Sequence, residues 1–280
     1  PAVGRPEPVE AAPVAPVKVL WDTSHGIDYF DSEWDPAKGG YYDTLRAELS
    51  KAGYDLTVSD KGVLIEDLSQ YDVIVVGVGQ AWGSCERKQM CLLFDCWYEY
   101  HWTEKPYGEK EIEKIYSFVE DGGGLIIMGG RWYRYIDNLG LFFPDQHVRG
   151  YENVLPLAKR FGASLEDVKI GGPINQLTAH EIFQGVSSVR THDGNCQSIG
   201  KEIVPPGQLV GSTSNGAAVS VAVVGRGKAV VVGDSHFATD GYIDDSGYQN
   251  REFTMNIFDW VSSPDTLTEP EILSGTWTAS

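Results

Sequence analysis

The feature that most constrains this chain is a series of short apolar runs, each ending in glycine or polar residues. Three of them are "VIVVGVG", "GLIIMGG" and "AVVVG", which have the length of strands and are rich in β-branched residues. Near-continuous apolar runs are typical of strands buried on both faces, as in parallel sheets. Amphipathic segments separate the runs, and this alternation of strand and helix predicts a parallel sheet with right-handed crossovers.

The predicted helices carry apolar residues at helical spacing. They span residues 41–55, 108–124 and 250–263, and the first two end at glycines. Residues 207–216 and 217–228 alternate in the manner of strands and meet at "SNG", which is a hairpin signal. We therefore predict an α/β fold with three layers. Its sheet is doubly wound, mostly parallel and flavodoxin-like, with a late β-hairpin elaboration.

The chain is predicted to contain one main domain, residues 17–262. Residues 1–16 are a Pro/Ala-rich segment without periodicity, which is typical of a linker, and residues 263–280 form a polar tail. Such linkers commonly follow a cleaved signal or an anchor, so we expect an exported protein, extracellular or at the cell surface. Residues 80–106 are a Cys- and aromatic-rich insertion, and a loop of that length in a compact domain is expected to be functional or stapled.

The charge of the chain excludes one class of partner. Forty acidic residues against 22 basic ones give a net charge of −18, and phosphate binding needs a basic face. We therefore expect no nucleic-acid partner. No apolar run approaches the roughly 20 residues of a membrane span, so we expect none in this chain. The acidity fits solubility alone, or a protein that handles cations.

Four cysteines, Cys85, Cys91, Cys96 and Cys196, form an even set. In an exported protein they predict two disulfides with three connectivities, one of which joins Cys85 to Cys96 and Cys91 to Cys196. A zinc site built from all four is the alternative, although the spacing lacks the usual C-x2-C element.

Polar residues follow the first and the late strand of the predicted sheet. Asp22 and His25 come after one, and Asp234, His236 and Asp240 after the other. Because the carboxyl ends of parallel strands open on one edge, these groups are expected to share a crevice. Carboxylate and imidazole are ligands for a divalent metal, calcium or zinc, which could activate water for hydrolysis. The alternative is that Asp234 only caps the turn after its strand.

Two acidic segments are further candidates for calcium. They are residues 28–35 and 240–245, and neither has the spacing of an EF-hand loop. Solvated acidic loops are the alternative interpretation.

Ligand-binding candidates lie at the same edge and in the insertion. They are Gln80, Trp82, Arg131 and Trp132 at strand ends, and Trp97, Tyr98 and Trp102 within the insertion. Aromatic rings of this kind stack on sugars or bury a partner's surface, so a glycan or a protein at the cell surface is the expected partner. The alternative is a small disulfide-stapled core that covers the sheet.

Several motifs occur in an order that resembles a known superfamily. They are "FVEDGGG" at Phe118–Gly124, "GDSHF" at Gly233–Phe237, Asn250–Arg251, and an N-x-x-x-W helix at Asn256–Trp260. The chain resembles the class I glutamine-amidotransferase-like superfamily over most of residues 17–261. Within it, the resemblance is to the branch of gliding-motility transporter-associated proteins, an intraflagellar-transport subunit, an oligosaccharyltransferase subunit and related exported prokaryotic domains.

The resemblance implies an amidotransferase-like fold and a binding or assembly role, and the sequence departs from the catalytic pattern. Amidotransferases place a cysteine on the turn after a central strand, where this chain has Arg131–Trp132, and no His-x-Glu element lies near the C-terminus. "DSH" stands where the branch usually has "DSD". We therefore expect a non-amidotransferase domain that binds a ligand, with a metal-assisted hydrolase and a scaffold subunit as the alternatives.

Overall fold

The computed structural model describes most of the predicted domain. The described residues are 15–25, 41–77, 84–92, 95–103, 105–130, 133–136, 138–144, 146–193 and 196–263. Four predicted ligand-binding residues, Gln80, Trp82, Arg131 and Trp132, lie outside these ranges. So do the acidic segment 28–35, the C-terminal tail from residue 264 and residues 1–14 of the predicted linker.

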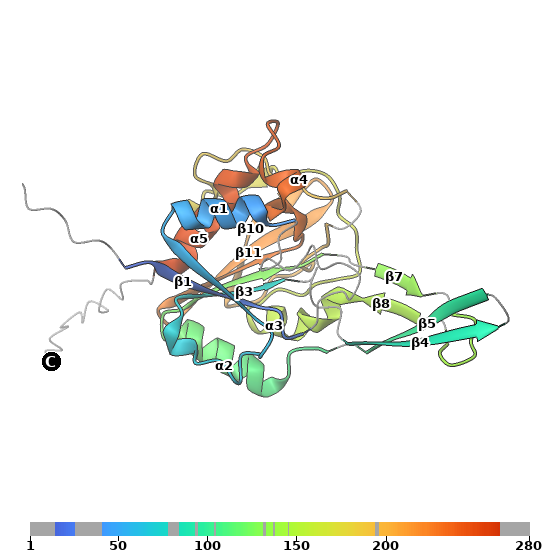
Figure 1. Cartoon of the computed structure of the whole chain (residues 1–280). Helices are drawn as coiled ribbons and strands as arrows, with labels where there is room; N and C mark the ends of the chain where they lie inside the picture. The colour runs from blue at the N-terminus through green and yellow to red at the C-terminus, as the bar shows by residue number, and fades with distance from the viewer. Residues whose placement is uncertain are drawn as a thin grey trace, which may run out of the picture.

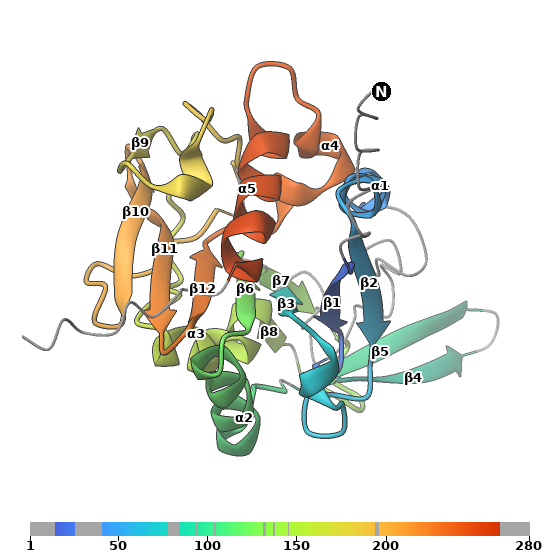
Figure 2. The same cartoon turned by 90° about the vertical axis from the view of Figure 1, so that its left-hand side faces the viewer.

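A central sheet of eight strands has the order β2-β1-β3-β6-β12-β11-β10-β9 (Figures 1 and 2). The parallel strands are β1 (Val17–Asp22), β2 (Tyr54–Ser59), β3 (Val73–Gly77), β6 (Gly124–Met128) and β12 (Gly227–Val232). The antiparallel ones are β11 (Gly216–Val224), β10 (Gly207–Thr213) and β9 (Gln176–Leu177). The predicted α/β fold and the late hairpin are confirmed, and the parallel part has the flavodoxin-like strand order.

Helices cover both faces of the sheet, which gives the three predicted layers (Figure 2). The helices are α1 (Asp43–Lys51), α2 (Glu109–Glu120), α3 (Leu155–Arg160), α4 (Asp240–Ile243) and α5 (Asn250–Ser262). α1 and α5 bury their apolar faces in one hydrophobic cluster with Trp21, and α2 and α3 bury theirs in a second cluster with Leu20. Trp21 and Leu20 are neighbours in β1, so the alternation of a strand divides its side chains between the two cores.

The turn between β11 and β12 shows why "GRGK" contains two glycines. Gly225 has φ +58°, and a Cβ there would lie 2.2 Å from the carbonyl oxygen of Glu120. A Cβ on Gly227 would lie 1.9 Å from the carbonyl oxygen of Val119. Glycine therefore lets this turn pack directly against the C-terminal end of α2.

The insertion forms a two-stranded arm that projects from the sheet (Figure 1). β4 (Ser84–Leu92) pairs with β5 (Asp95–Thr103) in an unbroken antiparallel register. A second hairpin of β7 (Tyr133–Ile136) and β8 (Gln146–Arg149) lies beside it. Long hairpins of this kind need a covering element for stability, and the second hairpin and its loop supply it.

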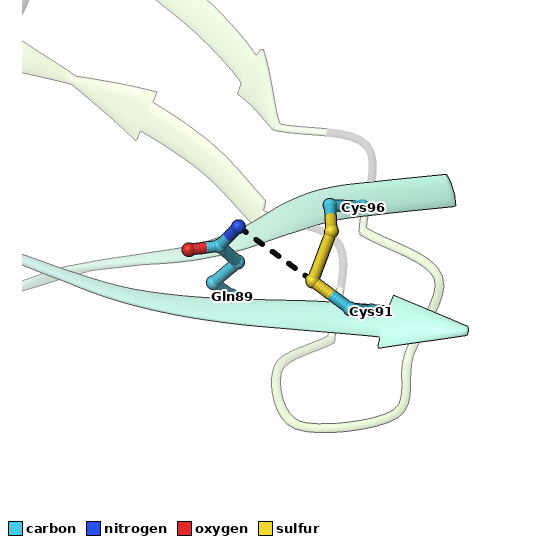
Figure 3. Close-up of a disulfide and its surroundings, with 3 residues drawn as sticks. All are labelled: Gln89, Cys91 and Cys96. Carbon is cyan, nitrogen blue, oxygen red and sulfur yellow. Dashed lines mark hydrogen bonds between the residues drawn. A yellow bond between two sulfur atoms is a disulfide. The ribbon is translucent and has the colours of Figure 1, made fainter. Parts of the chain in front are cut away.

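The cysteine pairing differs from the connectivity named in the sequence analysis, which joined Cys85 to Cys96 and Cys91 to Cys196. Cys91 is bonded to Cys96, its partner across the hairpin, with a Cα–Cα distance of 4.1 Å (Figure 3). Cys85 lies opposite Trp102, six residues along the strand from Cys91, so about 20 Å of strand separates it from Cys96. Cys196 is a free thiol buried in the main domain. The disulfide also removes two ligands from the hypothetical four-cysteine zinc site.

Short 3-10 helices complete the turns around the sheet, and among the described residues they are η2 (Leu68–Gln70), η4 (Gly150–Asn153), η5 (Glu181–Phe183) and η6 (His236–Ala238). Within the described part of the chain, no helix has the length and apolar character that crossing a membrane requires.

Candidate functional site

The two predicted Asp–His pairs lie at the ends of different strands. β1 delivers Asp22 and His25, and β12 delivers Asp234 and His236. β3 and β6 separate β1 from β12 in the sheet, so three interstrand spacings, roughly 14 Å, lie between the two strand ends. The structure therefore does not bring the four side chains together, as the hydrolase hypothesis required.

The end of β1 is filled by protein groups. One carboxylate oxygen of buried Asp22 accepts the Ser24 N–H at 2.9 Å, and the other accepts the Tyr107 hydroxyl at 2.7 Å. Burial, together with the neighbouring Asp22 charge, holds the pKa of Tyr107 well above its usual value. Tyr107 therefore stays a neutral donor at every physiological pH, and Asp22 is fully engaged.

His25 is equally enclosed. Its ring stacks on Tyr107 with centroids 3.6 Å apart, Nδ1 lies at 2.5 Å from the Lys105 carbonyl oxygen, and Nε2 lies at 3.2 Å from Glu111. Glu111 also accepts the Gly108 N–H at 2.8 Å and so caps α2. The segment 105–111 covers the end of β1. We call the end of β1, with Asp22, His25 and this covering segment, the closed end.

The end of β12 is organised by Asp234, which is fully buried. Its Oδ2 accepts the His192 N–H at 2.7 Å, and its Oδ1 accepts the His236 N–H at 3.0 Å. The His236 ring nitrogen Nδ1 lies 3.1 Å from the same Oδ1. Asp234 thus ties the loop at residue 192 to η6, which is the capping role that the sequence left as one of its alternatives.

Asn250 fixes the same loop from α5. Its side-chain oxygen accepts the Arg190 N–H at 2.7 Å, and its amide donates to the carbonyl oxygens of Arg190 at 2.9 Å and Phe237 at 3.0 Å. The asparagine of the Asn250–Arg251 motif is therefore a structural tie. Together, Asn250 and Asp234 position residues 190–192 beside η6.

The imidazoles at this end form a stack, and His192 of this stack lines a pocket. The His192 and His236 rings lie 4.4 Å apart, and Tyr242 lies 5.6 Å from His236 and 6.0 Å from His192. Burial and the nearby His236 lower the pKa of His192, so its neutral form is favoured at neutral pH. Burial raises the pKa of Tyr242.

The pocket has a volume of about 460 Å³, which is in the range of small-molecule sites. Its lining residues are Gly172, Pro173, Arg190, Thr191, His192, Asp193, Tyr242, Asp245 and Tyr248. The Arg190 guanidinium lies 4.7 Å from the centre of the Tyr242 ring and is ion-paired with Asp245. We call this cavity the β12 pocket. We call the end of β12, with Asp234, His236 and the pocket beside them, the open end.

The acidic candidates within residues 240–245 have protein partners. Asp240 accepts the Thr44 N–H at 2.8 Å, Asp244 pairs with Arg251, and Asp245 pairs with Arg190 and accepts the Gly247 N–H at 3.1 Å. Among the described residues, no three His, Cys, Asp or Glu side chains lie close enough together to hold one metal ion. Asp244 and Asp245 are thus paired with arginines, whereas a calcium site would need free carboxylates.

The described cysteine of the main domain is not an activated nucleophile. Cys196 is fully buried, and burial together with the charge of Asp234 raises the pKa of its thiol. Nucleophilic cysteines need a lowered pKa and access to substrate. This agrees with the departure from the amidotransferase pattern seen in the sequence.

The aromatic insertion residues lie on the arm, and the residues that line the β12 pocket belong to other parts of the chain. Tyr98 is partly exposed, and Trp97 is half-buried with its Nε1 in no hydrogen bond. Trp102 belongs to β5, and its side chain lies outside the described part. The arm is a disulfide-bonded hairpin that projects from the sheet, so it differs from the alternative of a stapled core that covers the sheet.

Comparison with known proteins identifies the fold. No family model matches the chain, and no curated protein matches it. Among solved structures, the mmIFT52 N-terminal domain aligns with a TM-score of 0.55 at 13% identity, covering 88% of this chain and 98% of that one. A cytoplasmic protein from Salmonella typhimurium aligns with a TM-score of 0.53 at 14% identity, over 89% and 100%. A ThuA-like protein from Bacteroides uniformis gives 0.50 at 13%, over 91% and 95%.

The chain shares the fold of these proteins. At such identities the likeness extends to the fold alone, and it agrees with the amidotransferase-like architecture that the motifs implied.

Most of the β12 pocket was missed in the sequence. Arg190, His192, Tyr242 and Tyr248 were not predicted, and His192 had no partner that the sequence could supply. Residues 190–193 lie about 50 residues before Tyr242 and Tyr248 along the chain, and tertiary contacts of Asn250, Asp234 and Asp245 bring them together. The usable signal was the polar cluster "THDG", which lies about 40 residues before "GDSHF" in the sequence.

Proposed function

We propose that this domain binds an uncharged glycan in the β12 pocket. The observation that supports it is the wall made by Tyr242, Arg190 and Asp245. It combines an aromatic face with a planar guanidinium and a carboxylate held in fixed positions. Carbohydrate sites use these elements, since a ring face covers the C–H side of a sugar and fixed polar groups bond its hydroxyls.

The charges around the pocket favour an uncharged ligand. The Arg190 charge is compensated by Asp245, while Asp193 lines the pocket and Asp234 lies just behind His192. The neutral form of His192 adds no cation at neutral pH. A phosphate, sulfate or uronic-acid group would therefore meet net negative charge, whereas a neutral sugar would not.

The contacts of Asp234 favour binding over hydrolysis. Both of its oxygens already accept backbone N–H groups, so the carboxylate serves the loop geometry. The hydrolase hypothesis also needs Asp22 and His25, and these two residues belong to the closed end.

The test is a binding screen of the full chain against defined neutral and acidic oligosaccharides on an array, followed by calorimetry with any neutral hit. Tyr242→Ala is expected to weaken binding by tenfold or more, because it removes the stacking face and the support of Arg190. Tyr98→Ala, which removes an exposed aromatic of the arm, is the matched control and should leave affinity unchanged. Loss of binding in Tyr98→Ala alone would move the site to the arm, and binding of acidic glycans only would contradict the proposal.

We also propose that the chain works outside the cytoplasm, at the cell surface or beyond it. The Cys91–Cys96 disulfide supports this location, because such bonds persist mainly in oxidising compartments. Immunodetection in fractions of the native host checks it, and recovery of the protein only in the cytosol with both thiols reduced would contradict it.

A further inference from the structure

The arm carries an apolar loop that faces water. Residues 138–144, "NLGLFFP", connect β7 to β8 and lie beside the outer part of β4 and β5 (Figure 1). Leu139 is 67% exposed, Leu141 59% and Phe142 46%. Residues 138–144 are uncharged, and Asp137 and Asp145 flank them in the sequence. We call these three exposed side chains the apolar tip.

A buried carboxylate holds this loop in shape. Glu99 of β5 is fully buried and accepts the backbone N–H groups of Leu141 at 3.1 Å, Phe142 at 2.6 Å and Phe143 at 2.9 Å. Although burial opposes the charged form, the three hydrogen bonds lower the pKa of Glu99 overall. The Asn138 amide closes the loop by donating to the Pro144 carbonyl oxygen at 2.8 Å.

The hydrogen bonds to Glu99 make it easier for the apolar tip to leave water. An irregular loop normally stays in water because its backbone N–H groups need partners, and unpaired groups are costly in lipid. Here the N–H groups of the three residues that follow Gly140 are already paired with Glu99. Leu141 and Phe142 of the apolar tip can therefore leave water with their backbone N–H groups already paired.

A cation lies at the base of the tip. The Lys88 ammonium of β4 is 5.0 Å from the Phe143 ring centre and 5.5 Å from that of Phe142. When an apolar loop enters the surface of a bilayer, a lysine at its base meets the lipid phosphates. The order of groups, apolar tip first and cation behind it, matches the order of layers in a lipid surface.

The size and shape of the tip favour lipid over a protein partner. Three side chains with these exposures present roughly 350 Å² if each has a full area near 200 Å². A stable protein interface takes about 800 Å² from each side and needs complementary shape. A projecting loop of this area is small for such an interface, and its size suits shallow insertion into a fluid apolar layer.

The length of the arm separates the apolar tip from the negative charge of the sheet domain. The chain carries a net charge of −18, and an anionic surface would repel it at close range. Strands of nine residues make the arm about 30 Å long, which is several screening lengths at physiological salt. The tip can touch lipid while the acidic sheet domain stays at a distance.

We propose that the loop 138–144 is a lipid-surface anchor, in which Leu139, Leu141 and Phe142 enter the outer layer of a zwitterionic bilayer. Binding is weak and reversible for one chain, since three side chains bury little area. The anchor is independent of the β12 pocket, and it would hold the domain at a membrane without spanning it.

The experiment is co-sedimentation of the full chain, disulfide intact, with phosphatidylcholine vesicles and with vesicles that also contain phosphatidylglycerol. The parent is expected to bind phosphatidylcholine with little dependence on salt. Leu141→Ser with Phe142→Ser should reduce the partition coefficient by about tenfold or more. Leu64→Ser with Ile65→Ser, at residues of the sheet domain that are 50% and 74% exposed, is the matched control and should bind like the parent.

Three results would overturn the proposal. One is failure of the parent to bind either vesicle, which would leave a protein as the partner of the tip. Another is binding only to the phosphatidylglycerol mixture that disappears with salt, which would indicate adsorption through charge. The third is equal loss in the tip variant and the control. Equal thermal midpoints for all three proteins, and unchanged sedimentation without vesicles, confirm that the tip variant is folded and that the tip does not join two copies.

Discussion

The closed end and the open end begin from the same local sequence pattern and differ in what covers them. Each is an Asp followed within three residues by His, placed after a parallel strand of one sheet. At the closed end the segment 105–111 supplies a hydroxyl, a carbonyl and a carboxylate that occupy Asp22 and His25. At the open end Asp234 and His236 are buried too, and the β12 pocket lies next to them, lined by His192 and Tyr242. Equal local patterns at two strand ends therefore lead to different surroundings, which later segments of the chain decide.

The largest expected effect is on stability, when the histidine of each end is replaced by alanine. His25→Ala removes the stacked ring from Tyr107 and leaves the Lys105 carbonyl and Glu111 without their partner, so we expect a loss of about 2–4 kcal/mol in the free energy of unfolding. His236→Ala leaves Asp234 with its two backbone donors, and about 1–2 kcal/mol is expected. Urea unfolding of both variants measures the difference. A larger loss in His236→Ala would break the comparison.

A conservative pair tests the same contrast with less disturbance. Tyr107→Phe removes only the hydroxyl that donates to buried Asp22, and leaving that carboxylate oxygen unpaired is expected to cost about 1–3 kcal/mol. Tyr242→Phe, at the half-buried ring of the open end, should change stability by less than about 0.5 kcal/mol. Thermal unfolding followed by calorimetry measures both. Equal losses would mean that the two ends are equally packed.

The smallest expected effect concerns pH at the open end. The pKa of His192 is lowered by burial and by His236, against the opposing charges of Asp234 and Asp193. The unfolded chain therefore binds a proton more readily, and this contribution to stability is complete above about pH 6.5 and is lost as the pH falls from there through the folded pKa. His192→Gln should flatten the dependence of the thermal midpoint between about pH 7.5 and 5.5. An unchanged slope would contradict this assignment.

The glycan screen and the vesicle experiment extend the comparison from stability to binding. Variants of the closed end should lose stability and keep both binding activities, whereas Tyr242→Ala should lose glycan binding with little change in stability. A closed-end variant that stays folded and loses glycan affinity would show that the two ends act together.

Several features of the fold could be predicted because they depend on local patterns. The strands around Val73–Gly77 and Gly124–Met128 are apolar on both faces, and that pattern fits only a sheet covered on both sides. The hairpin of β10 and β11 was visible in its alternation and its turn. The capping role of Asp234 was one of the alternatives, since an Asp after a strand has backbone N–H groups within reach.

The partners of each functional side chain could not be predicted, because they come from distant parts of the chain. Tyr107 reaches Asp22 across 85 positions, and Asn250 reaches Arg190 across 60. The pairing of Cys91 with Cys96 follows from the hairpin register, which the spacing of four cysteines does not contain.

The sequence by itself determined that this chain forms a parallel-centred α/β sheet with polar groups at its strand ends, because the periodicity of apolar residues is a local property. Only the tertiary structure decided that the end of β1 is closed, that the end of β12 opens on a pocket, and that Glu99 holds an apolar loop in water. Those outcomes depend on which segments meet in space, and long-range packing and buried hydrogen bonds settle that.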